Sequence, residues 1–589
     1  EQCAATFNKQ SIDFSDDDFS DEVASTSEID CLPVSSTEYK SNIIDTSQTQ
    51  LTVTNKTRGR KEIMTAKLSS ALDRCKISDR DAVHIIIAVA EALKVEVSDL
   101  VVNRSSIKRY REQSRMVLAN NIRKKFSTSE LNAIVLHWDG KLLLDLTGKQ
   151  TVDRLPIVIT NNDSEQLLGV PKLLQGTSKA QAEAIYQHLS EWGLMDHVKA
   201  ICFDTTATNT GRIGGTCILL EQWLERSLLY LPCRHHIYEI ILRSVFDHKF
   251  GSTFGPNVPL FQRFQLAWPK LNLNNFKPGL QDTKVSQHLN NSTECILKFC
   301  MSELTKIQCR EDYREFLELT VIFLNGTPAR HIFFRVPGAI HHARWMSKAI
   351  YCLKIFILRQ KYKLNKREYN SVRDICIFIV LCYVKAWFNA PNACVAPRQD
   401  LQFLRDLYDY KTIDENLSEV TLKKFINHLW YLSPESVGFA FFDNEISDDT
   451  KIKMVQALKK DNNVDGDSIN VEKRLYVKLN EIPSFINNTI ESFISDKTLN
   501  FFKRFNINYN FIETSPSTWE NNLEYKRGKE IISKLKIVND TAERAVKLIE
   551  DFNKIGPKNE EQKQYILQVV TEYRQQYSNS NKSTLMEKL

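Results

Sequence analysis

Two aspartates each end an apolar run in a way that suits metal-dependent phosphoryl transfer. Asp139 stands in "LHWDGK" and Asp204 stands in "AICFDTT". Breaking or joining a phosphodiester commonly uses two divalent cations about 4 Å apart, one at the attacking oxygen and one at the leaving oxygen. Mg²⁺ and Mn²⁺ take oxygen ligands, so carboxylates from distant parts of a chain must converge on them. We therefore expect Asp139 and Asp204 to be ligands in a two-metal site for Mg²⁺ or Mn²⁺.

Each aspartate also has a purely structural interpretation. Asp139 precedes Gly140, and Asp-Gly is a common hairpin turn; Asp145, six residues later, competes with it as a ligand. Asp204 is suited to capping the helix that follows its strand. The glycines in "TNTGRIGG" lack the lysine of a phosphate-binding loop, so we expect them to let a helix start close to the sheet.

The elements that must position these aspartates follow a definite order. The runs that predict strands and helices are, in turn, "LNAIVLHWDGKLLLDL", "DRLPIVITN", "EQLLGVPKLLQG", "SKAQAEAIYQHLSEWGL", "VKAICFDTT", "GGTCILLEQWLERS" and "LLYLPCRHH". Their periods give three neighbouring antiparallel strands and then alternating helices and strands, βββαβαβ, with an aspartate after the first and fourth strands. That order predicts an α/β protein with an RNase H-like mixed sheet.

At 589 residues the chain is long enough for several domains. Composition and periodicity predict helical segments at both ends and a large α-helical insertion that interrupts the core. The expected parts are an acidic disordered tail with a basic linker at 1–62, a helical segment that is a candidate for DNA binding at 63–126, the first part of the core at 130–240, the insertion at 241–430, a return to the core at 431–460, and a helical C-terminal region at 461–589.

The mild net charge of +6 is unevenly distributed. The first fifty residues carry about −9, which leaves about +15 on the rest. Within 104–125 a basic helix is expected, and four of its cations share one face because they are three or four residues apart; they are Arg104, Lys108, Arg111 and Arg115. This face either contacts DNA phosphates or is an ordinary solvated face.

The thirteen cysteines are scattered and none forms Cys-x-x-Cys, which predicts reduced thiols in an intracellular protein rather than a disulfide scaffold or a zinc ribbon. The longest apolar run, at 375–388, contains Lys385 and is too short to span a bilayer. We interpret it as a buried helix and expect no membrane partner. The basic "NKTRGRKE" at 55–62 is either a nuclear address or a solvated linker.

Further motifs give the chain a resemblance to the hAT superfamily of cut-and-paste DNA transposases. The two aspartates correspond to the first and second aspartates of that family. About thirty residues beyond the second, "LPCRHHIYEI" supplies a Cys-x-x-His with Cys233 and His236. An Arg-Trp pair, Arg344 and Trp345, opens a predicted helix of the insertion. The resemblance covers roughly residues 130–450.

The resemblance implies an RNase H-like catalytic domain with a helical insertion, and it implies roles for single residues. The aspartates would hold the metal ions, His236 would lie near the scissile phosphate, and Cys233 would support the strand-helix junction. Arg344 would hold a phosphate and Trp345 would stack on an extruded base. The chain departs from the family in the 109 residues between Cys-x-x-His and Arg-Trp, and in lacking a zinc finger before the core. No zinc is expected, because one cysteine and two histidines do not make a ligand set.

The third carboxylate of the family pattern is matched to Glu435 in "LSPESVGFAFF", at the expected start of the helix that returns to the core. A glutamate there also simply favours the helix dipole. Glu445 is the second choice.

Together these features predict a nuclear, metal-dependent DNA transposase that cleaves and joins DNA at terminal inverted repeats. The chemistry needs two DNA ends, so at least a homodimer is expected. The first alternative is a domesticated, catalytically inactive descendant that binds DNA or protein. The second is an RNase H-like nuclease, which leaves the insertion unexplained.

Overall fold

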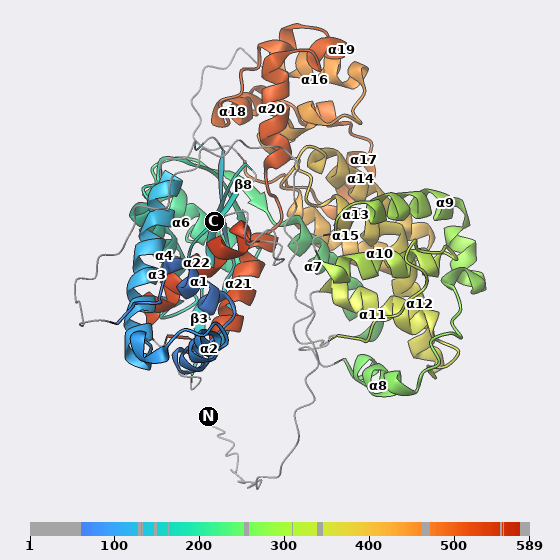
Figure 1. The fold of residues 1–589 in the computed structure, drawn as a ribbon. Coiled ribbons are helices and arrows are strands. Elements are labelled where there is room, and N and C mark those ends of the chain that lie inside the picture. The colour runs from blue at the N-terminus through green and yellow to red at the C-terminus, as the bar shows by residue number, and fades with distance from the viewer. Residues whose placement is uncertain are drawn as a thin grey trace, which may run out of the picture.

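The computed structural model describes residues 60–127, 131, 133–146, 150–162, 164–251, 258–308, 310–338, 345–460, 472–553, 556–557 and 559–577. The acidic tail that the sequence places at 1–50 lies outside the described residues. The described part is an α/β structure in which helices predominate around one mixed sheet (Figure 1).

The central sheet has five strands in the order β5-β4-β1-β7-β8. The strands are β1 (Ile134–Trp138), β4 (Ile157–Asn161), β5 (Ser164–Gly169), β7 (Val198–Phe203) and β8 (Leu229–Pro232). β1, β4 and β5 pair antiparallel, whereas β1, β7 and β8 pair parallel. Every residue of β1, β4 and β8 is buried, which indicates that both faces of the sheet are covered.

A second, smaller sheet has the order β2-β3-β6. It contains β2 (Lys141–Leu144), β3 (Thr151–Arg154) and β6 (Lys172–Leu173). The apolar run at 131–146, predicted as one strand, is therefore broken at Asp139 and Gly140 into β1 and β2, which belong to different sheets. Alternation of apolar residues does not reveal such a change of sheet, because both halves keep a strand-like pattern.

Helices from four separate parts of the chain pack around the sheet. They are α3 (Arg104–Ser127), α4 (Ser178–Glu191), α6 (Thr216–Trp223), α21 (Asp540–Asn553) and α22 (Glu560–Gln576). α21 contacts β1 and β4, α22 contacts β5, and α3 packs along α22. The N-terminal and C-terminal helices thus lie side by side on the sheet domain, at the left of Figure 1.

The N-terminal helical segment has its own small core. Two further helices, α1 (Ala66–Arg74) and α2 (Asp79–Ala92), pack with α3 around Leu72, Ile86 and Ile107. The Ser78 hydroxyl caps α2 by accepting a hydrogen bond from the backbone N–H of Asp81.

The predicted helical insertion is present as a body of helices on the right of Figure 1. Its helices are α7 (Arg234–Phe250), α8 (Pro259–Ala267), α9 (Thr283–Thr305), α10 (Glu311–Phe323), α11 (Trp345–Ile357), α12 (Lys366–Phe378), α13 (Val384–Asn389), α14 (Ala396–Asp409) and α15 (Glu415–Phe425). The apolar run at 375–388 is a buried helix, as predicted, with a π-helical turn at Ile379–Tyr383. Among the described helices, none is both long and apolar enough to cross a bilayer.

The C-terminal region divides into two parts. The helices α16 (Asp448–Lys460), α17 (Ile482–Phe485), α18 (Leu499–Arg504), α19 (Pro516–Trp519) and α20 (Leu523–Lys534) form a lobe at the top of Figure 1. α21 and α22 instead return to the sheet. The region at 431–460 meets the end of β8 at Tyr431, whose hydroxyl donates to the carbonyl of Pro232, and the chain packs on the sheet again from 540, where α21 begins.

Candidate active site at the carboxyl edge of the sheet

Asp139 and Asp204 follow adjacent parallel strands at the same edge of the sheet. β1 pairs with β7 so that His137 lies opposite Cys202. The aspartates are each two residues further on, so the same register puts them side by side where the two strands end. Neighbouring strands are about 4.8 Å apart, which is close enough for the two carboxylates to share a ligand.

The Asp204 carboxylate is oriented by its own loop. Its Oδ1 accepts hydrogen bonds from the Thr206 backbone N–H at 3.2 Å, the Thr206 hydroxyl at 2.7 Å and the Asn209 amide at 2.5 Å. Asn209 is held in turn by the Trp138 indole, which donates to its Oδ1 at 2.9 Å. The predicted capping role is thus partly present, because one oxygen bonds the loop before the short helix α5 (Ala207–Thr210). Its Oδ2 accepts no hydrogen bond from the described residues and is available to a ligand.

The Cys-x-x-His segment lies at the same edge, on the next strand. β8 pairs with β7 so that Pro232 lies opposite Phe203, and Cys233 therefore follows beside Asp204. Cys233 is buried, and its backbone N–H donates to the carbonyl of Phe203 at 2.8 Å. His236 stands in the first turn of α7. Burial lowers the pKa of His236, while the neighbouring Asp204 carboxylate opposes that effect.

The residues at the start of α21, which are far from β1 and β8 in the sequence, pack against this edge of the sheet. Asn539, just before the helix, donates through its side chain to the carbonyl of Trp138 at 2.7 Å and through its backbone N–H to the Cys233 sulfur at 3.1 Å. It therefore bridges the ends of β1 and β8. The first turn of α21 carries two acidic residues, Asp540 and Glu543, which our reading of the sequence missed. The signal was an Asn-Asp helix start with a glutamate after it, in "VNDTAERAV".

Of these two acidic residues, Asp540 has both carboxylate oxygens in contact with other side chains in a buried junction. One of its oxygens lies 3.2 Å from His235 Nδ1, and the other accepts from the Tyr313 hydroxyl at 3.2 Å. His235 Nε2 lies 3.1 Å from the carbonyl of Trp387, whose ring stacks on the imidazole at 3.9 Å. The two ring nitrogens of His235 thus lie beside a carboxylate oxygen and a carbonyl oxygen, and a ring nitrogen that carries a proton can donate to its neighbour. This junction ties α7, α21 and the helical insertion together.

Glu543 has a more open setting. It lies one helical turn after Asn539, whose carbonyl accepts its backbone N–H. Its carboxylate lies 3.8 Å from the Arg310 guanidinium, and both side chains are about one-third exposed. Glu543 therefore lies in the first turn of a helix that packs against β1, and its carboxylate faces a cation.

Glu435 and Glu445, the carboxylates expected from the sequence, do not lie at this edge. Glu435 is buried, and both of its oxygens are bound by Arg504 at 2.6 and 3.2 Å. Arg504 also donates to the carbonyl of Ser227, which precedes β8 at the end opposite Cys233. Glu445 pairs with Arg398 at 3.0 Å. Glu435 is therefore already bound by a cation away from the strand ends, whereas α21 carries Glu543 on a helix that contacts β1.

The predicted basic face of α3 is split by the structure. Arg104 and Lys108 are exposed, whereas Arg111 and Arg115 are only 3% and 4% exposed and both bind the buried Asp73. The expectation that Arg111 and Arg115 contact DNA is corrected: their guanidinium groups face the core of the N-terminal helices. Spacing on a helix indicates a shared face but not whether that face is turned outward.

The Arg-Trp pair lies at the border of what the structure describes. Arg344 lies outside the described residues, and Trp345 is the first residue of α11, with its side chain likewise outside them. Its predicted stacking on a base stays a prediction.

The donor chemistry of the edge fits a hard divalent cation, since it offers carboxylate oxygens and the Asp204 Oδ2 is open. Within the described residues, no three His, Cys, Asp or Glu side chains are arranged closely enough to hold a metal ion. No protein-family model matches the chain, and no curated protein matches it.

Proposed function

We propose that this chain is a metal-dependent DNA phosphodiester-transfer protein of the hAT transposase type, built on an RNase H-like core. The observation that carries the proposal is the placement of Asp139 and Asp204 after adjacent parallel strands of a five-stranded sheet whose order is β5-β4-β1-β7-β8. In sequence order of its own strands that sheet reads 3-2-1-4-5, with the second strand antiparallel to its neighbours.

The length between α7 and α21 favours a transposase over a simple nuclease. Residues 251–539 separate the Cys-x-x-His helix from the helix that brings Glu543 to the edge, and they form mostly helices. The junction of His235, Trp387 and Asp540 connects that insertion to the edge itself. An insertion that binds DNA needs a fixed position relative to the strand edge, and this junction supplies one.

In the proposed mechanism Asp139, Asp204 and Glu543 would hold Mg²⁺ or Mn²⁺. These ions, when bound, would activate the attacking oxygen and stabilise the leaving oxygen of the DNA strand. Asn209 and Thr206 hold one oxygen of Asp204 so that the other faces outward. The lowered pKa of His236 keeps its ring neutral near pH 7, so it can accept or donate one hydrogen bond close to a phosphate.

The proposal is tested with the purified full chain, Mn²⁺ and duplex DNA that carries the inverted repeats flanking the coding sequence. Wild-type protein should nick and join this DNA, and Asp204→Asn and Glu543→Gln should each abolish both reactions. The matched control is Glu445→Gln, because Glu445 is an exposed carboxylate paired with Arg398 away from the edge. Unchanged cleavage in Asp204→Asn would refute the enzymatic proposal.

A second candidate function is a domesticated DNA-binding factor without catalysis. The ion pair between Glu543 and Arg310 favours it, since a cationic side chain already faces the third carboxylate. Specific binding of the inverted repeats without cleavage by the wild type would decide for this candidate. Both proposals include a nuclear location. Both also include the pairing of two copies of the chain on two DNA ends.

A further inference from the structure

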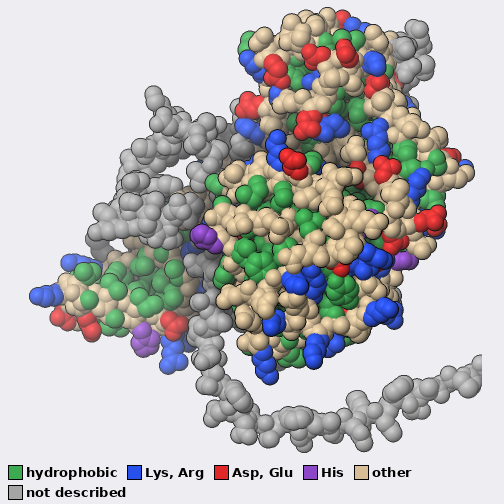
Figure 2. Space-filling view, turned by 90° about the vertical axis from the view of Figure 1, so that its right-hand side faces the viewer, with side chains coloured by type: hydrophobic (Ala, Val, Ile, Leu, Met, Phe, Trp, Pro, Cys, Tyr) green, Lys and Arg blue, Asp and Glu red, His purple; other side chains and the backbone are tan. Residues whose placement is uncertain are grey.

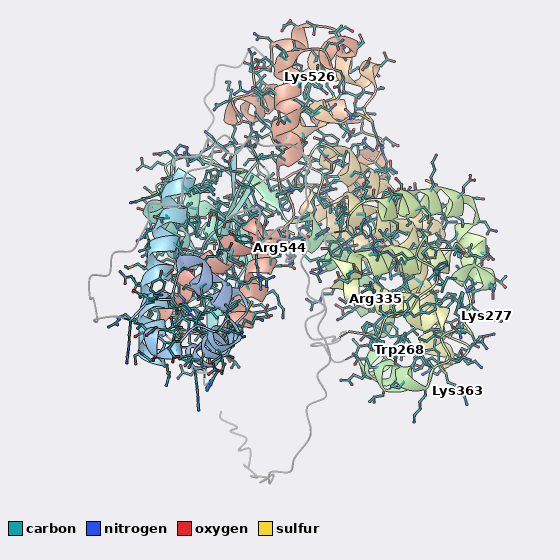
Figure 3. The ribbon with its side chains drawn as sticks, in the orientation of Figure 1. Trp268, Lys277, Arg335, Lys363, Lys526 and Arg544 are labelled. Atoms are coloured by element: carbon teal, nitrogen blue, oxygen red, sulfur yellow. The ribbon has the colours of Figure 1, made fainter. Side chains whose placement is uncertain are left out.

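The helical body carries a concentrated basic surface at its end near α8, far along the chain from the strand edge. We call it the basic tip and define it as Arg263 on α8, Lys277, and four cations of the α11–α12 connection: Lys361, Lys363, Lys366 and Arg367. Figure 3 places Lys277 and Lys363 with Trp268 in the lower right part of the molecule. Figure 2 shows Lys and Arg side chains gathered over the lower part of this side.

The connection between α11 and α12 is held firmly, so its cations are presented from a fixed frame. Tyr362 is buried, and its hydroxyl donates to the carbonyl of Leu260 on α8 at 3.1 Å. Arg359 donates to the carbonyls of Lys277 at 2.8 Å and Pro278 at 3.0 Å. Because Tyr362 points inward, its neighbours Lys361 and Lys363 are left exposed on either side.

The start of α12 is fixed by a capping box. Asn365 accepts the backbone N–H of Glu368 at 2.9 Å, and Glu368 accepts the backbone N–H of Asn365 at 3.1 Å. Lys366 and Arg367 therefore occupy the first turn, where the helix dipole disfavours cations. Two cations at that end cost stability unless an anion offsets them.

The charge of the tip is not neutralised within the described structure. Glu368 is the single carboxylate between residues 355 and 373, and it is already used by Arg263 and by the Asn365 backbone. Among the described residues, no carboxylate forms an ion pair with Lys361, Lys363 or Lys366. Two exposed lysines elsewhere on the helical body do have such partners: Lys306 has Glu303 and Lys423 has Glu419.

We propose that the basic tip binds the sugar-phosphate backbone of duplex DNA, at a place separate from the strand edge and without reading base sequence. The proposal rests on the proposed function, which supplies DNA as the polyanion. Point-like ammonium groups on a fixed frame suit phosphate contacts that position a duplex without specifying its sequence. The tip would hold DNA on the helical body while the strand edge acts on one end.

The test compares two triple variants of the full chain. The first replaces Lys361, Lys363 and Lys366 by glutamine, and affinity for a random-sequence duplex is measured by fluorescence anisotropy from 50 to 200 mM salt. Each lost phosphate contact lowers the salt slope of the binding constant by about 0.9. Loss of three contacts should therefore shrink the affinity change over this salt range by about 40-fold.

The control removes the same charge from positions outside the basic tip. Lys423, Lys453 and Lys459 are also replaced by glutamine; each has a carboxylate partner, at 2.5, 4.0 and 2.8 Å respectively. This variant should keep most of the wild-type salt slope. Equal slopes in the two triple variants would overturn the proposal, because net charge alone would then explain the binding.

Failure of the inference is distinguishable from failure of the proposed function. If the tip variant keeps its affinity while Asp204→Asn still abolishes cleavage, the tip is not a DNA contact and the enzymatic proposal stands. If the wild type binds vesicles of 30% phosphatidylserine more tightly than duplex DNA, the tip serves a membrane and the inference is wrong. If the tip variant loses binding and Asp204→Asn keeps it, the two sites are separate as proposed.

Discussion

Arg111 and Arg115 belong to a buried charge cluster of the N-terminal helices. The hypothesis to be tested is that these arginines stabilise the fold by pairing with the buried carboxylate of Asp73. Asp73 is fully buried, and its carboxylate accepts four hydrogen bonds, from Arg111 at 3.2 and 2.5 Å and from Arg115 at 2.8 and 2.6 Å. Arg111 has a second partner, Asp79, at 2.7 Å. Asp73→Ala would thus leave the Arg115 guanidinium buried without its carboxylate.

Removing one partner of a buried ion pair costs about 3–5 kcal/mol. That free energy corresponds to a loss of hydrogen-exchange protection of about 100-fold to 5,000-fold. The assay is hydrogen exchange with mass spectrometry on the full chain, read from peptides of α1, α2 and α3. Peptides of the sheet and of the helical body should keep their protection and serve as an internal reference.

Two further variants separate the effect of burying a charge on stability from the effect of the charge itself. Asp79→Ala removes a carboxylate that is about a quarter exposed, so it should cost no more than about 1 kcal/mol. Replacing Asp73 by leucine together with Arg111 and Arg115 by methionine should restore most of the protection, since apolar residues of similar volume often substitute for a buried ion cluster. Protection within tenfold of wild type in Asp73→Ala would refute the reasoning.

Three other predictions concern the site, pH and packing. Asn209→Ala removes the amide that holds Asp204 Oδ1, so cleavage should need about 10-fold to 100-fold more Mn²⁺, measured by metal titration. Burial lowers the pKa of His428 to about 3, so the folded state excludes a proton that the unfolded chain binds below pH 6.5. Stability should therefore fall as the pH drops below 6.5, by about 2 kcal/mol at pH 5, and His428→Gln should remove that part in pH-dependent urea melts. Gly279→Ala would put a Cβ 2.4 Å from the Phe323 ring and should lower the free energy of unfolding by about 1–3 kcal/mol in urea melts.

Each of these has a control in the chain. Gly214→Ala should be near neutral, because a Cβ there meets no atom within 4 Å. The reference for the pH profile is the wild-type chain, melted in parallel with His428→Gln at each pH. Thr210→Ala sits next to Asn209 but bonds only the Thr206 carbonyl, so it should leave the Mn²⁺ requirement unchanged. A pH profile that is the same with and without His428, or an Asn209→Ala protein with normal metal dependence, would contradict the reasoning.

Much of the central sheet follows from local patterns. The strand before each aspartate, the Ser78 cap and the buried helix at 375–388 are all read from neighbouring residues, because periodicity and capping are local properties. Once β1 and β7 are known to be adjacent and parallel, their register places Asp139 beside Asp204. The second sheet was missed, since β2 continues the apolar pattern of β1.

The remaining features depend on contacts between residues far apart in sequence, which no local pattern encodes. Glu435 and Glu543 both stand near the start of a helical turn, and only the packing of distant segments brings Arg504 to Glu435 and α21 to β1. Asn539 meets Trp138 across 401 positions.

By itself, then, the sequence determined that two aspartates end buried strands and that a helical body interrupts the sheet domain. Tertiary structure alone decided that Arg504 binds Glu435 and that Arg111 and Arg115 face inward. The physical reason is that burial of a charged group is set by what packs against it, and Arg115 is buried because Asp73, 42 positions away, lies beneath it.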